Sequence, residues 1–267
     1  KEFAELTAFA AALDGLEQLE KWDGAYYSEK FKQKLFSLDD EILKPYFQLE
    51  NVLQGAFTVA EKLFGITFKE VFDIDKYHAD VQTFEVLDFE GQLVAVFYAD
   101  FFPRKGKRNG AWMTSFKPQY IKNGVNERPH VSIVCNFTPP TESKPSLLTF
   151  NEVTTLFHEF GHALHGMLAN TTYPSLSGTS VYWDFVELPS QIMENWCYEP
   201  EALALFAKHY QTGEIIPQQY VDKIKESASF LEGMATLRQL SFGILDMAYH
   251  AKAQTIDNVK AFEKAAM

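Results

Sequence analysis

Two histidines and a glutamate near the middle of the chain have the spacing of a metal site. His158 and His162 are four residues apart with Glu159 beside the first, so on a helix both imidazoles project from one face and can reach one ion. In the pattern H-E-x-x-H the histidines bind zinc and the glutamate acts as a general base. The alternative is a structural pair of histidines. The pattern arises by chance about 0.016 times in a chain of this composition, so we favour the metal site.

A helix with a defined start is expected to carry these residues. Thr149 and Glu152 have the spacing of a capping box, and Leu148 and Val153 have that of a hydrophobic staple. The apolar residues that then recur at helical spacing are Val153, Leu156, Phe157, Phe160, Ala163 and Leu164. The sequence therefore predicts an amphipathic helix whose buried face fixes the metal site in a core.

A catalytic zinc ion has three protein ligands and keeps a fourth position open for water. Glu187 follows the helix after a loop, and Pro189 is tolerated only in the first turn of a helix. Glu187 is therefore expected near the start of a second helix. Asp184 and Glu194 are rival carboxylates, the first better explained as an N-cap and the second as a solvated group or a support for a ligand. Spacing alone leaves the choice open.

Several stretches together resemble the M3 family of zinc oligopeptidases, a thimet oligopeptidase-like and neurolysin-like group. The stretches that carry the resemblance are residues 156–165 (LFHEFGHALH), 134–137 (VCNF) and 177–191 (SGTSVYWDFVELPSQ). Residues 46–55 and 104–113 look most like the branch of the peptidyl-dipeptidase Dcp and oligopeptidase A. The resemblance covers nearly the whole chain. It implies that His158, His162 and Glu187 hold one Zn²⁺ ion and that Glu159 is the catalytic base.

The resemblance also implies a function, zinc-dependent hydrolysis of peptide bonds in short oligopeptides. The stretches similar to Dcp imply release of dipeptides from a free C-terminus, and the alternative is internal cleavage, as in neighbouring oligopeptidases. A different class of function is a non-catalytic zinc module that binds peptides. It would need a closed site with four ligands, whereas the sequence offers three convincing ones. In the loop at 170–182, we expect Gly178 and Tyr182 to contact the substrate, and we expect His165 to support the site or lie at the surface.

Composition excludes some partners. The chain has 24 basic and 36 acidic residues and a formal charge of −12, which argues against nucleic acid and anionic membrane. Cys135 and Cys197 do not form a disulfide framework, so we expect two buried thiols in a reducing, cytoplasmic compartment. No apolar run has the length of a membrane span, and the first residues do not resemble a signal peptide. We expect the full-length protein to be a monomer.

The fold class is expected to be mostly α with a small β-sheet, an α+β zincin-like metallopeptidase domain. We divide residues 1–267 into a helical part at 1–70, a small sheet at 81–137 and the zinc-site helices at 149–267. In the middle part, the runs at 81–87 and 93–99 predict a hairpin with a five-residue loop, and 130–137 predicts a further strand.

Three finer expectations follow from the same patterns. The strand at 93–101 is our candidate for the sheet edge along which a substrate lies. Residues 104–110, which mix glycine with basic residues, match no phosphate-binding motif and are expected to form a flexible turn. Residues 217–250 are expected to be helical, and Gly24 and Gly65 are expected to end helices.

The isolated chain is expected to be catalytically incomplete. The resemblance implies a further stretch rich in tyrosine and glycine, with a histidine, that donates hydrogen bonds to the reaction intermediate. We do not find it up to Met267, and Tyr249 and His250 lack the surrounding glycines. The large N-terminal helical part of the family also has no counterpart beyond residues 1–70. We therefore expect the flanking parts of the family to be absent.

Overall fold

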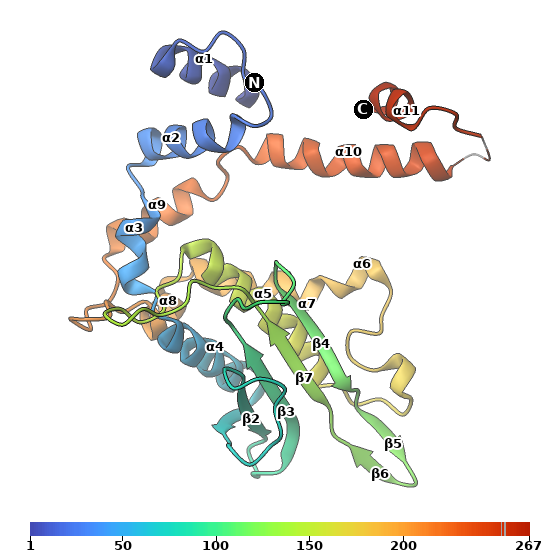
Figure 1. Ribbon diagram of the computed structural model, residues 1–267. Helices are drawn as coiled ribbons and strands as arrows, with labels where there is room; N and C mark the ends of the chain where they lie inside the picture. Colours follow the sequence, from blue (N-terminus) through green and yellow to red (C-terminus); the bar gives the residue numbers. More distant parts are fainter. Residues whose placement is uncertain (252, 254) are drawn as a thin grey trace. The chain divides into compact units, whose positions relative to one another are not determined.

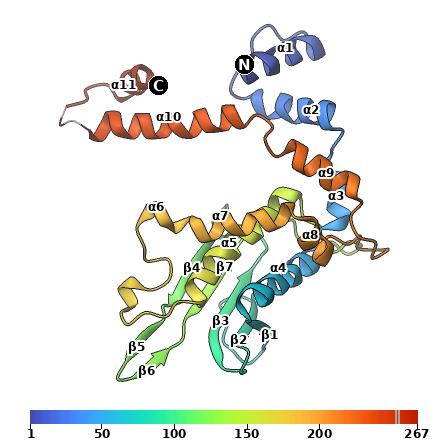
Figure 2. The same ribbon diagram turned by 180° about the vertical axis from the view of Figure 1, so that it is seen from behind.

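The computed structural model describes residues 1–251, 253 and 255–267. These residues form two compact units, one of residues 39–222 and one that combines residues 1–38 with residues 223–267. Figure 1 shows the course of the chain, and Figure 2 shows it from behind. His158, His162 and Glu187 all belong to the larger unit. The three-part division predicted from the sequence stays a prediction.

A mixed sheet forms one layer of the larger unit. Its strands are β1 (Thr67–Glu70), β2 (Gln82–Leu87), β3 (Leu93–Asp100), β4 (Trp112–Lys117) and β7 (His130–Val134). Their order is β1-β2-β3-β7-β4, with β3 and β7 parallel and the other neighbours antiparallel. Two short strands, β5 (Tyr120–Lys122) and β6 (Val125–Glu127), pair separately.

The prediction that residues 93–101 form the sheet edge is wrong. β3 lies between β2 and β7, and the edge strands are β1 and β4. The side chains of β3 are buried from Ala95 to Asp100, as expected for a strand covered on both faces. The predicted hairpin of β2 and β3 is confirmed, with residues 88–92 as its loop.

Helices cover one face of this sheet. α4 (Leu49–Phe64) and α5 (Phe150–Met167) lie on the same face (Figures 1 and 2). Phe160 of α5 meets Phe57, Phe68 and Phe97 at ring-centroid distances of 5.8, 5.6 and 5.9 Å. These tilted and edge-on rings bury large apolar areas. The aromatic cluster therefore anchors the middle of α5 to both α4 and the sheet.

The predicted start of α5 is confirmed. Thr149 is the N-cap, and its side chain and that of Glu152 form a reciprocal capping box. Leu148 and Val153 are both fully buried, as a hydrophobic staple requires. Shorter helices complete the larger unit: α3 (Asp40–Leu43), α6 (Trp183–Val186), α7 (Leu188–Glu194), α8 (Pro200–Phe206) and the 3-10 turns at 44–46, 174–176 and 195–198.

The smaller unit is helical. It contains α1 (Glu2–Asp14), α2 (Gly24–Phe36), α10 (Glu232–His250) and α11 (Val259–Ala266), and α9 (Gln218–Ser227) crosses the boundary between the units. Gly65 ends α4 as predicted, whereas Gly24 begins a helix instead of ending one. The expected helix at 217–250 is broken at Leu231, which has a positive φ of 57° and precedes α10. No helix among the described residues is long and apolar enough to cross a membrane.

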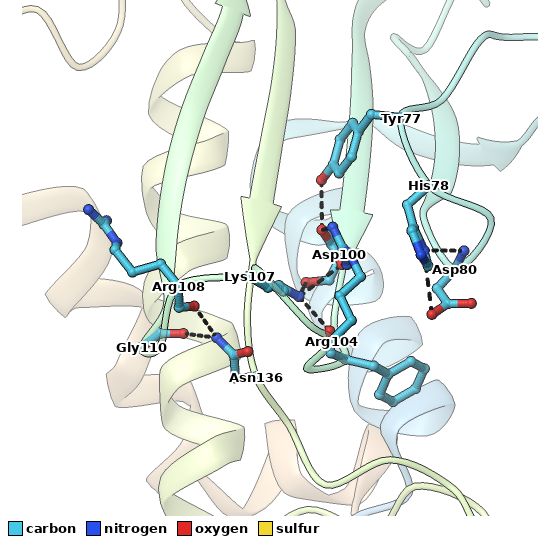
Figure 3. A network of polar contacts seen from close by, with 10 residues as sticks. Tyr77, His78, Asp80, Asp100, Arg104, Lys107, Arg108, Gly110 and Asn136 are labelled. Atoms are coloured by element: carbon cyan, nitrogen blue, oxygen red, sulfur yellow. Dashed lines mark hydrogen bonds and ion pairs between the residues drawn. The ribbon is translucent and has the colours of Figure 1, made fainter.

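A buried carboxylate holds the loop between β3 and β4 (Figure 3). Asp100, 1 % exposed, accepts two hydrogen bonds from Arg104 at 2.7 and 2.8 Å and one each from Lys107 and Tyr77 at 2.9 Å. Burial alone would raise the pKa of Asp100, but the hydrogen bonds from Arg104, Lys107 and Tyr77 outweigh it and hold the pKa below its usual value. The turn at residues 104–110, which was expected to be flexible, is thus bound to Asp100 at the end of β3 by its own side chains Arg104 and Lys107.

Replacing Asp100 with Asn should destabilise the protein by about 3 kcal/mol, because the cations of Arg104 and Lys107 would lose their buried partner. Chemical denaturation near pH 7 measures this loss. The contribution of Asp100 is fully present above its usual pKa of 3.8 and is lost as the pH falls through the lowered value. Asp80→Asn, at an exposed carboxylate that forms a salt bridge with His78 and interacts with Arg104 only through its charge, is the control and should change stability by less than about 0.5 kcal/mol. Equal effects of the two substitutions would contradict the prediction.

The cap of α5 gives a second stability prediction. Thr149→Ala removes the side-chain acceptor for the amide of Glu152 and should lower the free energy of unfolding by about 1 kcal/mol. Thr155→Ala removes the same atoms from the interior of the same helix, where alanine has the higher helix propensity. It should leave stability unchanged or slightly raised in the same denaturation experiment.

Candidate metal centre

Two helices bring the predicted ligands together. α5 presents His158 and His162 one turn apart, with ring centroids separated by 4.9 Å. Glu187 is the N-cap of α7, and its Oε2 lies 3.2 Å from Nε2 of His158 and 3.1 Å from Nε2 of His162. The three ligand atoms all lie within 4.8 Å of one another. The residues chosen from the sequence therefore converge on one point.

The donor set fits a zinc ion. Nitrogen and oxygen ligands lie about 2.0–2.2 Å from tetrahedral zinc, which places them about 3.4 Å apart, close to the 3.1 and 3.2 Å observed. Nδ1 of His158 lies 2.6 Å from Oε1 of Glu194, so Nε2 is the nitrogen left to face an ion. A carboxylate on the far nitrogen of a ligating histidine is a common support in zinc sites. The geometry thus suits a divalent metal held by two imidazoles and one carboxylate.

The surroundings keep Glu187 ionised. Burial alone would raise its pKa, but the hydroxyl of Ser190, which donates to Glu187 Oε2 at 2.8 Å, and the two histidines outweigh burial and lower it. Pro189 occupies the first turn of α7, as expected. The rival Asp184 lies in the first turn of α6, whose N-cap is Tyr182, so the N-cap role expected for Asp184 is wrong.

Gly161 permits the close approach of α5 and α7. A Cβ atom at this position would lie 2.6 Å from both the carbonyl oxygen of Pro189 and Cα of Ser190. Such distances are shorter than van der Waals contact, so any side chain here would push the first turn of α7 away from α5. Because Glu187 is the residue before that turn, Gly161 controls how near Glu187 comes to the two histidines. Sequence reasoning missed this role, since the contact joins distant segments.

Glu159 lies beside the ligands and points into the same cavity. Its side chain is 7 % exposed, and burial, helped by the charge of Glu187 and opposed by His158, raises its pKa to about 6. A carboxyl group with a pKa near the working pH can both accept and return a proton. The cavity measures about 450 Å³ and is lined by Ala111, Trp112, Met113, His158, Glu159, His162, Thr179, Val186 and Glu187. We call it the metal pocket.

The remaining predicted residues lie outside the metal pocket. Gly178 packs on α5, where an added Cβ would be 2.9 Å from Cα of Gly166, and Tyr182 is 88 % exposed. Their neighbours Thr179 and Val186 line the pocket instead. Contact of Gly178 and Tyr182 with a substrate stays a prediction. His165 is not part of the ligand cluster, and its ring meets that of Phe185.

The edge strand β4 borders the metal pocket. Ala111, Trp112 and Met113 line it, and Met113 packs on α5 at Gly166, where a Cβ would lie 2.7 Å from Cε of Met113. One side of β4 pairs with β7, and the other side is the free edge of the sheet. The edge strand beside the metal pocket is therefore β4, and not β3 as predicted. The hydrophobic pattern of the sequence did not single out β4.

Replacing Glu194 with Gln should weaken zinc binding about tenfold, because the predicted ligand His158 would lose its charged partner. Competition with a chromophoric chelator measures the dissociation constant without any need for catalysis. Glu201→Gln is the matched control, since Glu201 is an exposed carboxylate at the start of α8. Unchanged zinc affinity in the Glu194 variant would show that the hydrogen bond between Glu194 and His158 does not strengthen zinc binding.

Comparison with known proteins identifies the family of the chain. The chain is 46 % identical to Oligopeptidase A of Escherichia coli K12 over all of its length, and 42 % identical to Dipeptidyl carboxypeptidase of the same organism over 98 %. It is 40 % identical to Probable cytosolic oligopeptidase A of Arabidopsis thaliana over 94 %. It spans 39 %, 39 % and 36 % of these relatives. The family described as Peptidase family M3 matches residues 1–265, and the chain therefore belongs to peptidase family M3.

Proposed function

We propose that this chain is the metal-binding part of a zinc-dependent peptidase that hydrolyses short peptides. The observation that carries the proposal is the placement of Glu159, a buried carboxyl group, beside three convergent ligands in the metal pocket. The names of the relatives, oligopeptidase and dipeptidyl carboxypeptidase, support the same reaction. Because the chain spans 39 % of the length of these two relatives, we propose the activity for the full-length protein.

In the proposed mechanism, three residues of the metal pocket hold the metal and a fourth, Glu159, transfers the proton. Zinc held by His158, His162 and Glu187 would supply Lewis acidity, which polarises a carbonyl group and lowers the pKa of water. Glu159 accepts one proton from the attacking water as the oxygen bonds to the carbonyl carbon. It then donates that proton to the amine nitrogen as the C–N bond breaks. The place of Glu159 in the metal pocket, beside the three proposed ligands, suits both transfers.

The free edge of β4 offers a place for the peptide backbone. Unpaired amide and carbonyl groups along an edge strand can bind an extended peptide as an additional strand. Since Trp112 and Met113 are the first residues of β4 and line the metal pocket, a peptide paired there passes the proposed ligands. This placement favours short, extended peptides as substrates.

The cleavage mode we propose is the release of dipeptides from a free C-terminus, and internal cleavage is the alternative within the same family. A non-catalytic zinc module is disfavoured by the three-ligand cluster together with Glu159. We also infer a cytoplasmic location, supported by the two free, buried cysteines and by the name of the plant relative. The inference of a monomer rests on the sequence resemblance alone.

Glu159→Gln in the full-length protein should leave zinc binding intact and lower kcat about a hundred- to ten-thousandfold, because the amide cannot accept the proton. Metal analysis and hydrolysis of a quenched fluorescent peptide measure the two properties on the same sample. Glu201→Gln again serves as control and should behave as wild type. A zinc-loaded Glu159 variant with near wild-type turnover would refute the mechanism.

A further inference from the structure

The loop between β3 and β4, residues 101–111, carries four basic residues and is here called the basic loop. Two of them, Arg104 and Lys107, are bound to the buried carboxylate of Asp100. Asp100 and Trp112, which flank the loop, both pair with Val134 of β7. The basic loop therefore begins and ends at the same level of the sheet, next to the start of the edge strand.

Side chains hold the backbone of the basic loop on both sides of Arg108 (Figure 3). Nζ of Lys107 donates to the carbonyl oxygens of Asp100 and Phe102 at 3.2 and 2.7 Å. Nδ2 of Asn136 donates to the carbonyl oxygens of Arg108 and Gly110 at 2.9 and 2.8 Å. Arg108 thus projects from a backbone that is held by side chains of the protein itself.

The guanidinium group of Arg108 is available to a ligand. Figure 3 shows its side chain directed away from Asp100, and it forms no ion pair with a carboxylate among the described residues at the distances of a salt bridge. Its Cζ atom lies over the ring of Trp112, 4.7 Å from the centroid. Stacking on an indole ring fixes the position of a guanidinium while its hydrogen-bond donors stay free.

Trp112 links this cation to the metal pocket, because it lines both that pocket and a second cavity in which Arg108 takes part. The described side chains that line the metal pocket include two carboxylates, Glu159 and Glu187, and no lysine or arginine. A free carboxylate on a peptide would therefore find no cationic side chain there. A cationic side chain available to that carboxylate is Arg108, which stacks on Trp112.

The direction of β4 determines which end of a peptide meets Arg108. β4 runs from Trp112 to Lys117, and antiparallel pairing is about two to three times as common as parallel pairing. A peptide added antiparallel to β4 runs toward Trp112, so its C-terminal end points to the basic loop. Since the metal pocket lies at the very start of β4, only a short segment at about 3.3 Å per residue separates the cleaved bond from Arg108.

We propose that Arg108 binds the free C-terminal carboxylate of the peptide and thereby determines specificity for short C-terminal fragments. This rests on the proposed peptidase function and deepens it. A guanidinium can hold a carboxylate by two parallel hydrogen bonds, and the stacked, preformed position of Arg108 lowers the entropy cost of ordering it.

The test uses the full-length zinc enzyme and one peptide sequence in two forms, with a free C-terminal carboxylate and with a C-terminal amide. For the free acid, Arg108→Gln should lower kcat/KM about ten- to a hundredfold, the value of a hydrogen bond to a charged group. For the amide, kcat/KM should not change. Arg108→Lys should restore part of the preference for the acid.

Lys105→Gln is the matched control, because Lys105 is an exposed cation of the same loop. It should leave the acid-to-amide ratio at the wild-type value. An equal loss for both peptides in Arg108→Gln would indicate a structural effect and overturn the proposal, and so would an unchanged ratio.

A binding measurement separates this proposal from the proposed function. Calorimetry of the zinc-loaded protein with the dipeptide Ala-Phe and with its C-terminal amide needs no turnover. Arg108→Gln should weaken binding of the acid alone, and equal binding of acid and amide by wild type would refute the role of Arg108. If wild type hydrolyses neither peptide but still distinguishes acid from amide by Arg108, the peptidase function fails and the carboxylate site stands.

Discussion

The close packing of α5 on α7 at Gly161 is the contact on which the metal centre depends. The histidines come from one helix and Glu187 from the N-cap of another, so their convergence requires the two backbones to lie at one separation. Gly161 lies between the two histidines in sequence, and its missing side chain leaves room for the carbonyl oxygen of Pro189 and Cα of Ser190. A glycine inside a helix costs about 1 kcal/mol of stability relative to alanine. Here the glycine allows Glu187 to come within 3.1–3.2 Å of the two histidines.

Phe160, the residue before this glycine, fills space where Gly161 leaves it empty. Phe160 is fully buried against Phe57, Phe68 and Phe97, so a large aromatic ring presses α5 onto the sheet and α4 while Gly161 admits α7 on another side. Two adjacent residues thus set the position of the helix between its neighbours. The predicted metal ligands His158 and His162, on either side of this pair of residues, take their position from it.

Features encoded by neighbouring residues were readable from the sequence. The capping box of Thr149 and Glu152, the i, i+4 histidines and the hairpin around residues 88–92 each depend on a few consecutive side chains. The edge role of β4 and the contact of Gly161 with α7 depend on which strands and helices become neighbours. Local spacing does not contain that information, so these features required the fold.

Electrostatics connects the basic loop to the metal centre. Glu159 and Glu187 face the metal pocket, Glu194 lies behind His158, and the chain as a whole carries a charge of −12. The charge of a zinc ion would be taken up largely by Glu159 and Glu187, so a cationic side chain outside the pocket is the group left to attract the free carboxylate of a peptide. Asp100 neutralises part of the basic loop but leaves Arg108 unpaired among the described residues. The buried carboxylate therefore binds Arg104 and Lys107 and leaves Arg108, which stacks on Trp112 beside the metal pocket, for a substrate.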